Sequence, residues 1–305
     1  MNFVRERLPL VNVVMPIQLV RIARRPFMKY SVSCSLGYKV EEETVCFFNL
    51  QPSQFDRQVI LDEHLDLSGG REIDRFTMGE SGNRFFKVLA PPGKLLVKYR
   101  AEVDLDPLIE APEAIKAVAP IDLPLDVLPH LNPSRFCQSD RLRAFANREF
   151  GHIERGHGLV TAICNWIHDN LDYLPGSSHG NTSAVDTIID HAGVCRDFAH
   201  LGITMCRAMD IPARYVSSYA FRLDPPDFHA TFEAFLGGRW YLFDATRKAA
   251  LDGLIRIGVG RDAAEVSFSS FFGKAEADEM KVSISSTDRG TGGDLTTQAV
   301  SLSER

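Results

Sequence analysis

One cysteine at the start of a predicted buried helix constrains this chain more than any other feature. The segment 192–200 reads Ala-Gly-Val-Cys-Arg-Asp-Phe-Ala-His, and Gly193 predicts a turn immediately before the helix. Apolar and small residues then recur at helical spacing as far as Met209, and Pro212 ends the pattern. Cys195 therefore falls in the first helical turn, where unpaired N–H groups and the helix dipole stabilise an anion such as a thiolate.

A cysteine in this position has two interpretations. It is either a small apolar core residue, which is the commoner case, or a nucleophile that reacts as its thiolate. Two downstream residues, His229 and Asp244, favour the nucleophile. Thiol, imidazole and carboxylate together are the set of groups that nucleophilic catalysis by cysteine requires.

The predicted register of a β-hairpin brings His229 and Asp244 close together. Two aromatic-rich segments flank a Gly-Gly pair, which predicts a hairpin with a two-residue turn. If Leu236 pairs with Arg239, Asp244 pairs with Thr231 and lies diagonally from His229 on the same face. Diagonal neighbours are about 7–8 Å apart at the backbone, so an imidazole–carboxylate hydrogen bond is within reach. A three-residue loop with a bulge would break this register.

This order of cysteine, histidine and aspartate resembles the transglutaminase-like superfamily, whose core is related to papain. The similarity is strongest to its bacterial branch, often described as cysteine proteases, and covers about residues 140–260. The matching segments are the nucleophile motif at 193–200, the strand after the central helix at 211–217, the histidine motif at His229-Ala230 and the aspartate motif at 243–246. The tryptophan that usually follows the family's histidine is replaced here by Thr231 and Phe232.

The resemblance implies a role for each residue of the triad. Cys195 attacks the carbonyl carbon of an amide or ester, His229 accepts and returns the proton, and Asp244 orients the imidazole. The oxyanion is held by the Cys195 backbone N–H and one further donor, for which Trp166 is the candidate. The alternative for Trp166 is a core position on an amphipathic helix.

We predict a cysteine peptidase or amidase that acts on a peptide or protein substrate through a thioester. An acyltransferase that passes the thioester to an amine is one alternative, and a non-catalytic binding domain with the same fold is another. The intact triad argues against the binding domain. Hydrolysis is favoured because the sequence shows no calcium-binding acidic cluster or regulatory extension.

The chain as a whole predicts an α+β fold in two parts. In residues 28–104, short segments in which apolar residues alternate with polar or small ones predict an antiparallel N-terminal β-sandwich or barrel. Residues 105–138 are proline-rich and predict a semi-rigid connector. Residues 139–286 are expected to form the papain-like catalytic domain, in which the helix carrying the cysteine packs on an antiparallel sheet. Residues 287–305 are rich in Ser, Thr and Gly and predict a disordered tail.

Residues 1–27 are basic around a short apolar stretch. Prolines interrupt that stretch, which is too short to span a membrane. We expect a non-native extension upstream of a start at Met28. The alternative is a signal peptide, although no small-residue cleavage site is evident.

Composition excludes several classes of protein. A net charge of −6 and a pI near 5.9 argue against a general nucleic-acid binder. The 6 cysteines form no CxxC pairs and the histidines lack metal-ligand spacing, which indicates a reducing compartment rather than disulfides or zinc. We expect a cytoplasmic protein with no metal, no cofactor, and no nucleic-acid or membrane partner. The sequence favours no particular oligomeric state.

Overall fold

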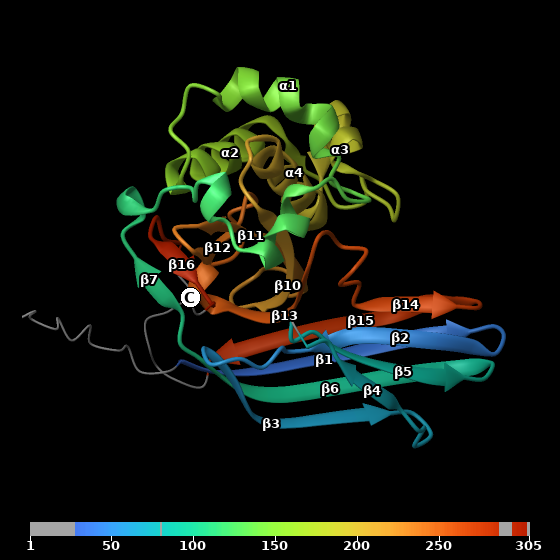
Figure 1. Ribbon diagram of the computed structural model, residues 1–305. Coiled ribbons are helices and arrows are strands. Elements are labelled where there is room, and N and C mark those ends of the chain that lie inside the picture. Colours follow the sequence, from blue (N-terminus) through green and yellow to red (C-terminus); the bar gives the residue numbers. More distant parts are fainter. Residues whose placement is uncertain (1–27, 80, 287–294, 304–305) are drawn as a thin grey trace, which may run out of the picture.

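The computed structural model describes residues 28–79, 81–286 and 295–303. The basic segment 1–27 and most of the predicted tail lie outside the described residues. Figure 1 shows helices gathered on one side of a central sheet and a larger β layer on the other side. In the part of the chain that is described, no helix is long and apolar enough to cross a membrane.

The N-terminal part is an open antiparallel β-sandwich and not a closed barrel. One sheet has the strand order β15-β1-β6-β3 and the other has the order β14-β2-β5-β4. Buried and less buried residues alternate along β6, as the period-two pattern predicts. The strands of the first part of the chain are β1 (Met28–Val40), β2 (Thr44–Gln51), β3 (Gln58–Leu67), β4 (Asp74–Thr77), β5 (Arg84–Ala90) and β6 (Gly93–Leu105).

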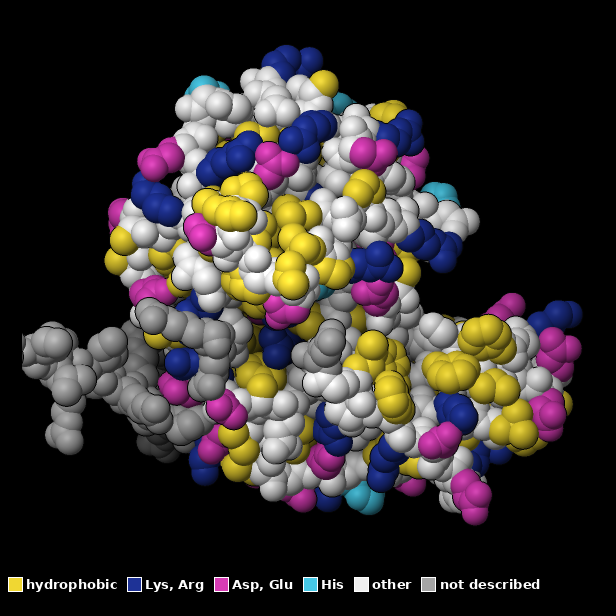
Figure 2. All heavy atoms as spheres, in the orientation of Figure 1, with side chains coloured by type: hydrophobic (Ala, Val, Ile, Leu, Met, Phe, Trp, Pro, Cys, Tyr) yellow, Lys and Arg dark blue, Asp and Glu magenta, His cyan; other side chains and the backbone are white. Residues whose placement is uncertain are grey.

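Two strands from the end of the chain complete this sandwich. β14 (Ser269–Phe272) pairs with β2, and β15 (Ala275–Ser286) pairs with β1 along almost its whole length. Both segments lie within the range predicted for the catalytic domain, 139–286, and their hydrogen bonds to β2 and β1 correct that boundary. The alternation of apolar and polar residues predicts that a segment is a strand, but it does not predict which distant strand will pair with it. Figure 2 shows hydrophobic side chains gathered over the ends of β14, β2 and β5.

A second, six-stranded antiparallel sheet carries the catalytic half of the molecule. Its order is β13-β10-β11-β12-β16-β7. Residues 299–301 form β16 between β12 and β7, so this part of the predicted tail is ordered. The strands are β7 (Leu108–Glu110), β10 (Ala213–Ala220), β11 (Phe228–Leu236), β12 (Arg239–Phe243), β13 (Leu254–Gly260) and β16 (Ala299–Ser301).

Helix α4 (Cys195–Ala208) is the centre of the helical layer. It packs against β11 and β10 and is surrounded by α1 (Ser139–Phe150), α2 (His157–Asn170) and α3 (Ala184–Asp190). Because neighbours cover it on all sides, every residue of α4 from Asp197 to Ala208 is buried. The short parallel pair β8 (Asp172–Tyr173) and β9 (Ala192–Gly193) precedes this helix.

The proline-rich connector packs on the catalytic sheet. It contains short 3₁₀ helices at Pro112–Ala114, Pro120–Asp122 and Leu125–Leu131. Its apolar side chains Leu123 and Val127 form a small cluster with Phe235 and Trp240 of the β11–β12 hairpin.

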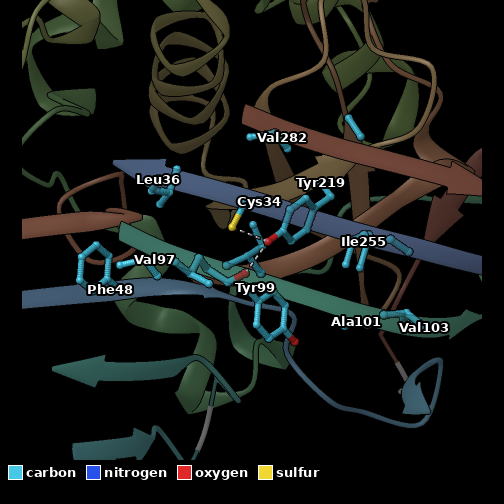
Figure 3. Packing of buried hydrophobic residues seen from close by; sticks show 14 of the residues in the cluster. Cys34, Leu36, Phe48, Val97, Tyr99, Ala101, Val103, Tyr219, Ile255 and Val282 are labelled. Carbon is cyan, nitrogen blue, oxygen red and sulfur yellow. Dashed lines mark hydrogen bonds between the residues drawn. The ribbon is translucent and has the colours of Figure 1, made fainter. Parts of the chain in front are cut away.

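The sandwich and the catalytic sheet share one hydrophobic core. Tyr219 of β10 points into the sandwich and donates its hydroxyl to the Leu50 carbonyl at 2.9 Å, with the Cys34 sulfur 3.5 Å away (Figure 3). Two buried amide side chains also bind the backbone of β13. The Gln58 side-chain amide accepts a hydrogen bond from the Arg256 N–H and donates one to the Arg256 carbonyl. The Asn83 side-chain amide makes the same two hydrogen bonds with the backbone of Val259. These hydrogen bonds provide partners for backbone N–H and C=O groups of β13, the edge strand of the catalytic sheet, and they fix the sandwich against that sheet.

Candidate active site

Cys195 is the first residue of α4, as predicted. The Val194 N–H donates to Oδ2 of the fully buried Asp197 at 2.8 Å, and the Ser178 hydroxyl donates to Oδ1 at 3.0 Å. A Cβ added to Gly193 would lie 2.7 Å from the Asp197 Cβ. Glycine is therefore required at position 193 because the Asp197 side chain packs directly against its backbone. The sequence had instead suggested a turn conformation that only glycine adopts easily. The buried aspartate fixes the turn that delivers the cysteine.

The β11–β12 hairpin brings His229 and Asp244 together. Leu236 pairs with Arg239, so the predicted register is confirmed. His229 Nε2 and Asp244 Oδ2 are 2.9 Å apart, and the two side chains are 1% and 3% exposed. This bond leaves Nδ1 as the ring nitrogen that is free to face the thiol.

Asp244 is held by its own turn as well as by the histidine. Its Oδ1 accepts hydrogen bonds from the Thr246 N–H at 2.8 Å and the Thr246 hydroxyl at 2.7 Å. Burial would raise the pKa of Asp244, but the His229 charge and these hydrogen bonds lower it below its ordinary value. The carboxylate is therefore ionised at neutral pH.

The imidazole of His229 is protonated at neutral pH. Burial would lower its pKa, but the Asp244 carboxylate, its hydrogen bond and the nearby Cys195 thiol raise that pKa to about 10. A cationic imidazole between a carboxylate and a thiol is the arrangement that stabilises a thiolate nucleophile.

Cys195 differs from the other cysteines in its exposure. It is half-buried, and with His229 it lines a cleft of about 440 Å³ between the helical layer and the sandwich. The other five thiols are buried, and burial raises the pKa of each. For Cys34 and Cys46 the value is about 11. Only one thiol is therefore placed for nucleophilic chemistry among the described residues.

The structure places Trp166 away from this cleft. Its ring packs edge-on against Phe145 at 5.3 Å and Phe150 at 6.4 Å, both on α1. It is not among the residues that line the cleft with Cys195. Trp166 therefore occupies a core position on an amphipathic helix, which was the alternative prediction. This placement does not support Trp166 as the oxyanion donor.

Tyr173 is a neighbour of Cys195 that the sequence did not reveal, although it is not one of the residues that line the cleft. It pairs with Gly193 across the short β8–β9 ladder, and its hydroxyl faces the backbone and the sulfur of Cys195. Its ring packs on Phe198 with centroids 5.8 Å apart, and Lys248 Nζ lies 4.3 Å from the ring centroid. Burial and the Cys195 sulfur raise the pKa of Tyr173, so its hydroxyl keeps its proton. A two-residue ladder has no periodic pattern by which the sequence could reveal it.

The two residues that replace the family's tryptophan do not form a cleft wall. Thr231 is 1% exposed, and Phe232 is fully buried with its ring against Gly202 of α4. Neither lines the cleft. In the described ranges, no group of three or more His, Cys, Asp or Glu side chains is arranged to hold a metal ion.

Comparisons with known proteins agree with this geometry. Residues 144–245 match the transglutaminase-like superfamily, and residues 28–126 match the bacterial transglutaminase N-terminal domain. A crystal structure of a candidate cysteine protease from Cytophaga hutchinsonii is 41% identical, with a TM-score of 0.88. That similarity covers 92% of this chain and 99% of the other.

Similar curated proteins come from mycobacteria. An uncharacterized protein of Mycobacterium leprae is 28% identical over 251 residues, which are 76% of this chain and 88% of that protein. An uncharacterized protein of Mycobacterium tuberculosis is 28% identical over 153 residues, 47% of this chain and 48% of its own length. The family and its structural relative support a thiol enzyme. The chain belongs to the transglutaminase-like superfamily, in the branch that carries the bacterial transglutaminase N-terminal domain.

Proposed function

We propose that this protein is a cysteine peptidase or amidase that cleaves an amide bond through a thioester on Cys195. One observation carries the proposal. A half-buried thiol that lines a cleft lies beside a buried imidazole that is 2.9 Å from a buried carboxylate. Burying charged groups of this kind costs desolvation free energy, and such groups cluster at catalytic sites.

In the first step, the Cys195 thiolate attacks the carbonyl carbon of the substrate amide. The C–S bond forms, the carbonyl oxygen takes the negative charge, and the C–N bond then breaks. His229 gives its Nδ1 proton to the leaving nitrogen, so an amine departs and a thioester remains. Asp244 keeps the ring in the orientation that this transfer requires.

In the second step, water attacks the thioester carbonyl. His229 accepts a proton from the water, the C–S bond breaks, and the substrate leaves as its carboxylic acid. Cys195 returns to the thiolate and His229 to the imidazolium.

The oxyanion of both steps is assigned to the Cys195 backbone N–H and the Tyr173 hydroxyl. The proximity of that hydroxyl to the backbone and sulfur of Cys195 supports this role. Tyr173→Phe should lower kcat by about 10²–10³-fold, the usual effect of removing one oxyanion donor. Alkylation of Cys195 by iodoacetamide forms no oxyanion, so the same variant should keep most of its alkylation rate. Equal losses in both reactions would show that Tyr173 only supports the fold.

The proposal is tested by a peptide and amide library screen with mass spectrometry of the intact protein. We expect some library members to leave an acyl group on wild-type protein, and none to do so on Cys195→Ser. A wild-type protein that forms no adduct and cleaves nothing across the library would favour the binding-domain alternative.

An added primary amine separates hydrolysis from acyl transfer. If water is the natural acceptor, amine should change the products little and leave the total rate nearly constant. Saturable incorporation of amine, lost in Cys195→Ser, would replace the hydrolase proposal with the acyltransferase.

A further inference from the structure

Two arginines line the same cleft as Cys195. Arg196 follows the nucleophile on α4, and Arg135 lies on the connector. Both guanidinium groups lie over the ring of Phe136, with their central carbons 5.0 Å and 5.8 Å from its centroid. Two cations over one aromatic ring create a local positive patch in the cleft.

The two arginines differ in how far the protein balances their charge. Arg135 is exposed, donates to the Asn181 side-chain oxygen at 3.3 Å, and has no carboxylate within 4.0 Å among the described residues. Arg196 Nη2 donates to the Ser178 hydroxyl and the His179 carbonyl and lies 3.5 Å from Asp197 Oδ1, whereas its buried Nε has no partner. An exposed guanidinium without a carboxylate partner, as in Arg135, is suited to bind an incoming carboxylate.

The wall that carries Arg135 is rigid. The Phe136 N–H donates to Asp262 Oδ2 at 3.0 Å, and the Phe136 ring stacks on the buried His200 at 5.0 Å. Burial lowers the pKa of His200 to about 3, so this ring is neutral and adds no charge. Arg207 also ties the connector to α4 by donating to the Asn132 carbonyl at 3.0 Å. A positive group on such a support is preorganised for binding.

An acidic residue lines the same cleft. Asp227 lines it beside Phe228 and interacts electrostatically with His229. Burial raises the pKa of Asp227 above its ordinary value. A bound substrate therefore meets both the two arginines and an acidic group in this cleft.

We propose that Arg135 and Arg196 form a subsite for a substrate carboxylate, so that the enzyme acts on peptides with an acidic group beside the reactive amide. The carboxylate comes from an Asp or Glu side chain or from a free C-terminus. The assignment rests on the proposed role of Cys195 as the nucleophile.

Paired alkylating reagents test the subsite without knowledge of the substrate. Iodoacetate and iodoacetamide attack the same sulfur and differ in charge, so the ratio of their rates at Cys195 reports the local field. We expect Arg135→Gln to lower this ratio by about threefold or more, and Arg135→Glu to lower it further. Added salt should reduce the ratio of wild-type protein towards that of Arg135→Gln.

Arg148→Gln is the matched control. Arg148 is an exposed arginine that also lies over a phenylalanine ring, 5.2 Å from Phe145, but it is outside the cleft. Its replacement should leave the ratio at the wild-type value. An unchanged ratio in both Arg135 variants, with Cys195 still alkylated, would overturn the subsite alone. Failure of both reagents to select Cys195 would instead overturn the proposed function.

A peptide series identifies the source of the carboxylate. Amidated peptides with Glu should be cleaved with higher kcat/KM than the same peptides with Gln if the side chain is recognised. Free-acid peptides with neutral side chains should be preferred if the C-terminus is recognised. In either case Arg135→Gln should remove the preference, and equal kcat/KM across the series in wild-type protein would contradict the subsite.

Discussion

At the scale of single residues, the site depends on one buried ion pair beside one accessible thiol. Burial disfavours both charges of the His229–Asp244 pair, and each charge is maintained by the other. Thr246 adds two hydrogen bonds to the carboxylate. Removing either partner leaves the other buried and unpaired, so catalysis and stability are linked here.

Asp244→Asn should reduce turnover far more than it reduces stability. The amide preserves the size of the side chain, but it cannot balance the imidazolium or fix its tautomer. By analogy with other triads the loss in kcat is about 10⁴-fold. It is measured with a substrate from the library screen, alongside thermal unfolding. Asp252→Asn alters another buried aspartate outside the cleft and should keep kcat near the wild-type value. Full activity in Asp244→Asn would remove Asp244 from the triad.

The raised pKa of His229 makes the stability of the protein depend on pH. The folded-state pKa is about 10 and the ordinary value is 6.5. The imidazolium therefore stabilises the fold fully below pH 6.5, and this contribution is lost as the pH rises to 10. The difference in unfolding free energy between wild type and His229→Gln should shrink by at least about 1 kcal/mol over that range. A difference that does not change with pH would mean that His229 is neutral in the folded protein.

At the scale of elements, the close contact between α4 and β11 fixes the central helix on the sheet that carries His229. A Cβ on Gly202 would lie 2.5 Å from the Phe232 ring. That ring cannot move aside easily, because it is fully buried and stacks on Phe243 with centroids 5.6 Å apart. The glycine allows the helix to approach the strand this closely.

Gly202→Ala should therefore destabilise the protein by about 1–3 kcal/mol through overpacking. Chemical denaturation measures this loss. Phe232→Leu removes the atoms that would clash, so the double variant should recover part of the loss. Strict additivity of the two changes would show that the contact does not limit the approach of α4.

The same elements show what the sequence can and cannot predict. The hairpin register was predictable because a two-residue turn fixes the pairing of adjacent strands. The partners of β14, β15 and β16 were not, because those pairings join distant segments. Arg135 was missed for the same reason. Only the packing of the connector brings it beside Cys195.

At the scale of the whole molecule, the sandwich and the catalytic half are built as one unit. Strands from both ends of the chain complete the sandwich sheets, and Tyr219 extends from the catalytic sheet into the sandwich core. Gln58 provides a further link between the two halves, because its side-chain amide forms hydrogen bonds with the backbone of both Ser53 and Arg256. We infer that the two halves unfold together.

Gln58→Ala should lower the stability of the whole protein within a single transition. The change leaves the Arg256 N–H without its buried partner, at a cost of about 1–3 kcal/mol. Calorimetry measures both the number of transitions and the midpoint. Gln54→Ala, at an exposed position in the loop that precedes β3, serves as the control and should leave the midpoint unchanged. Two separate transitions in Gln58→Ala would mean that the halves are independent.

Brief iodoacetamide treatment followed by peptide mapping tests the central claim most directly. Cys195 should be modified at least about tenfold faster than the other five thiols near neutral pH, because only this thiol combines exposure, a helix N-terminus and an imidazolium. His229→Gln should remove most of that advantage. Equal labelling of Cys195 and Cys34 in the wild-type protein, or undiminished selectivity in His229→Gln, would contradict the assignment of Cys195 as a nucleophile activated by His229.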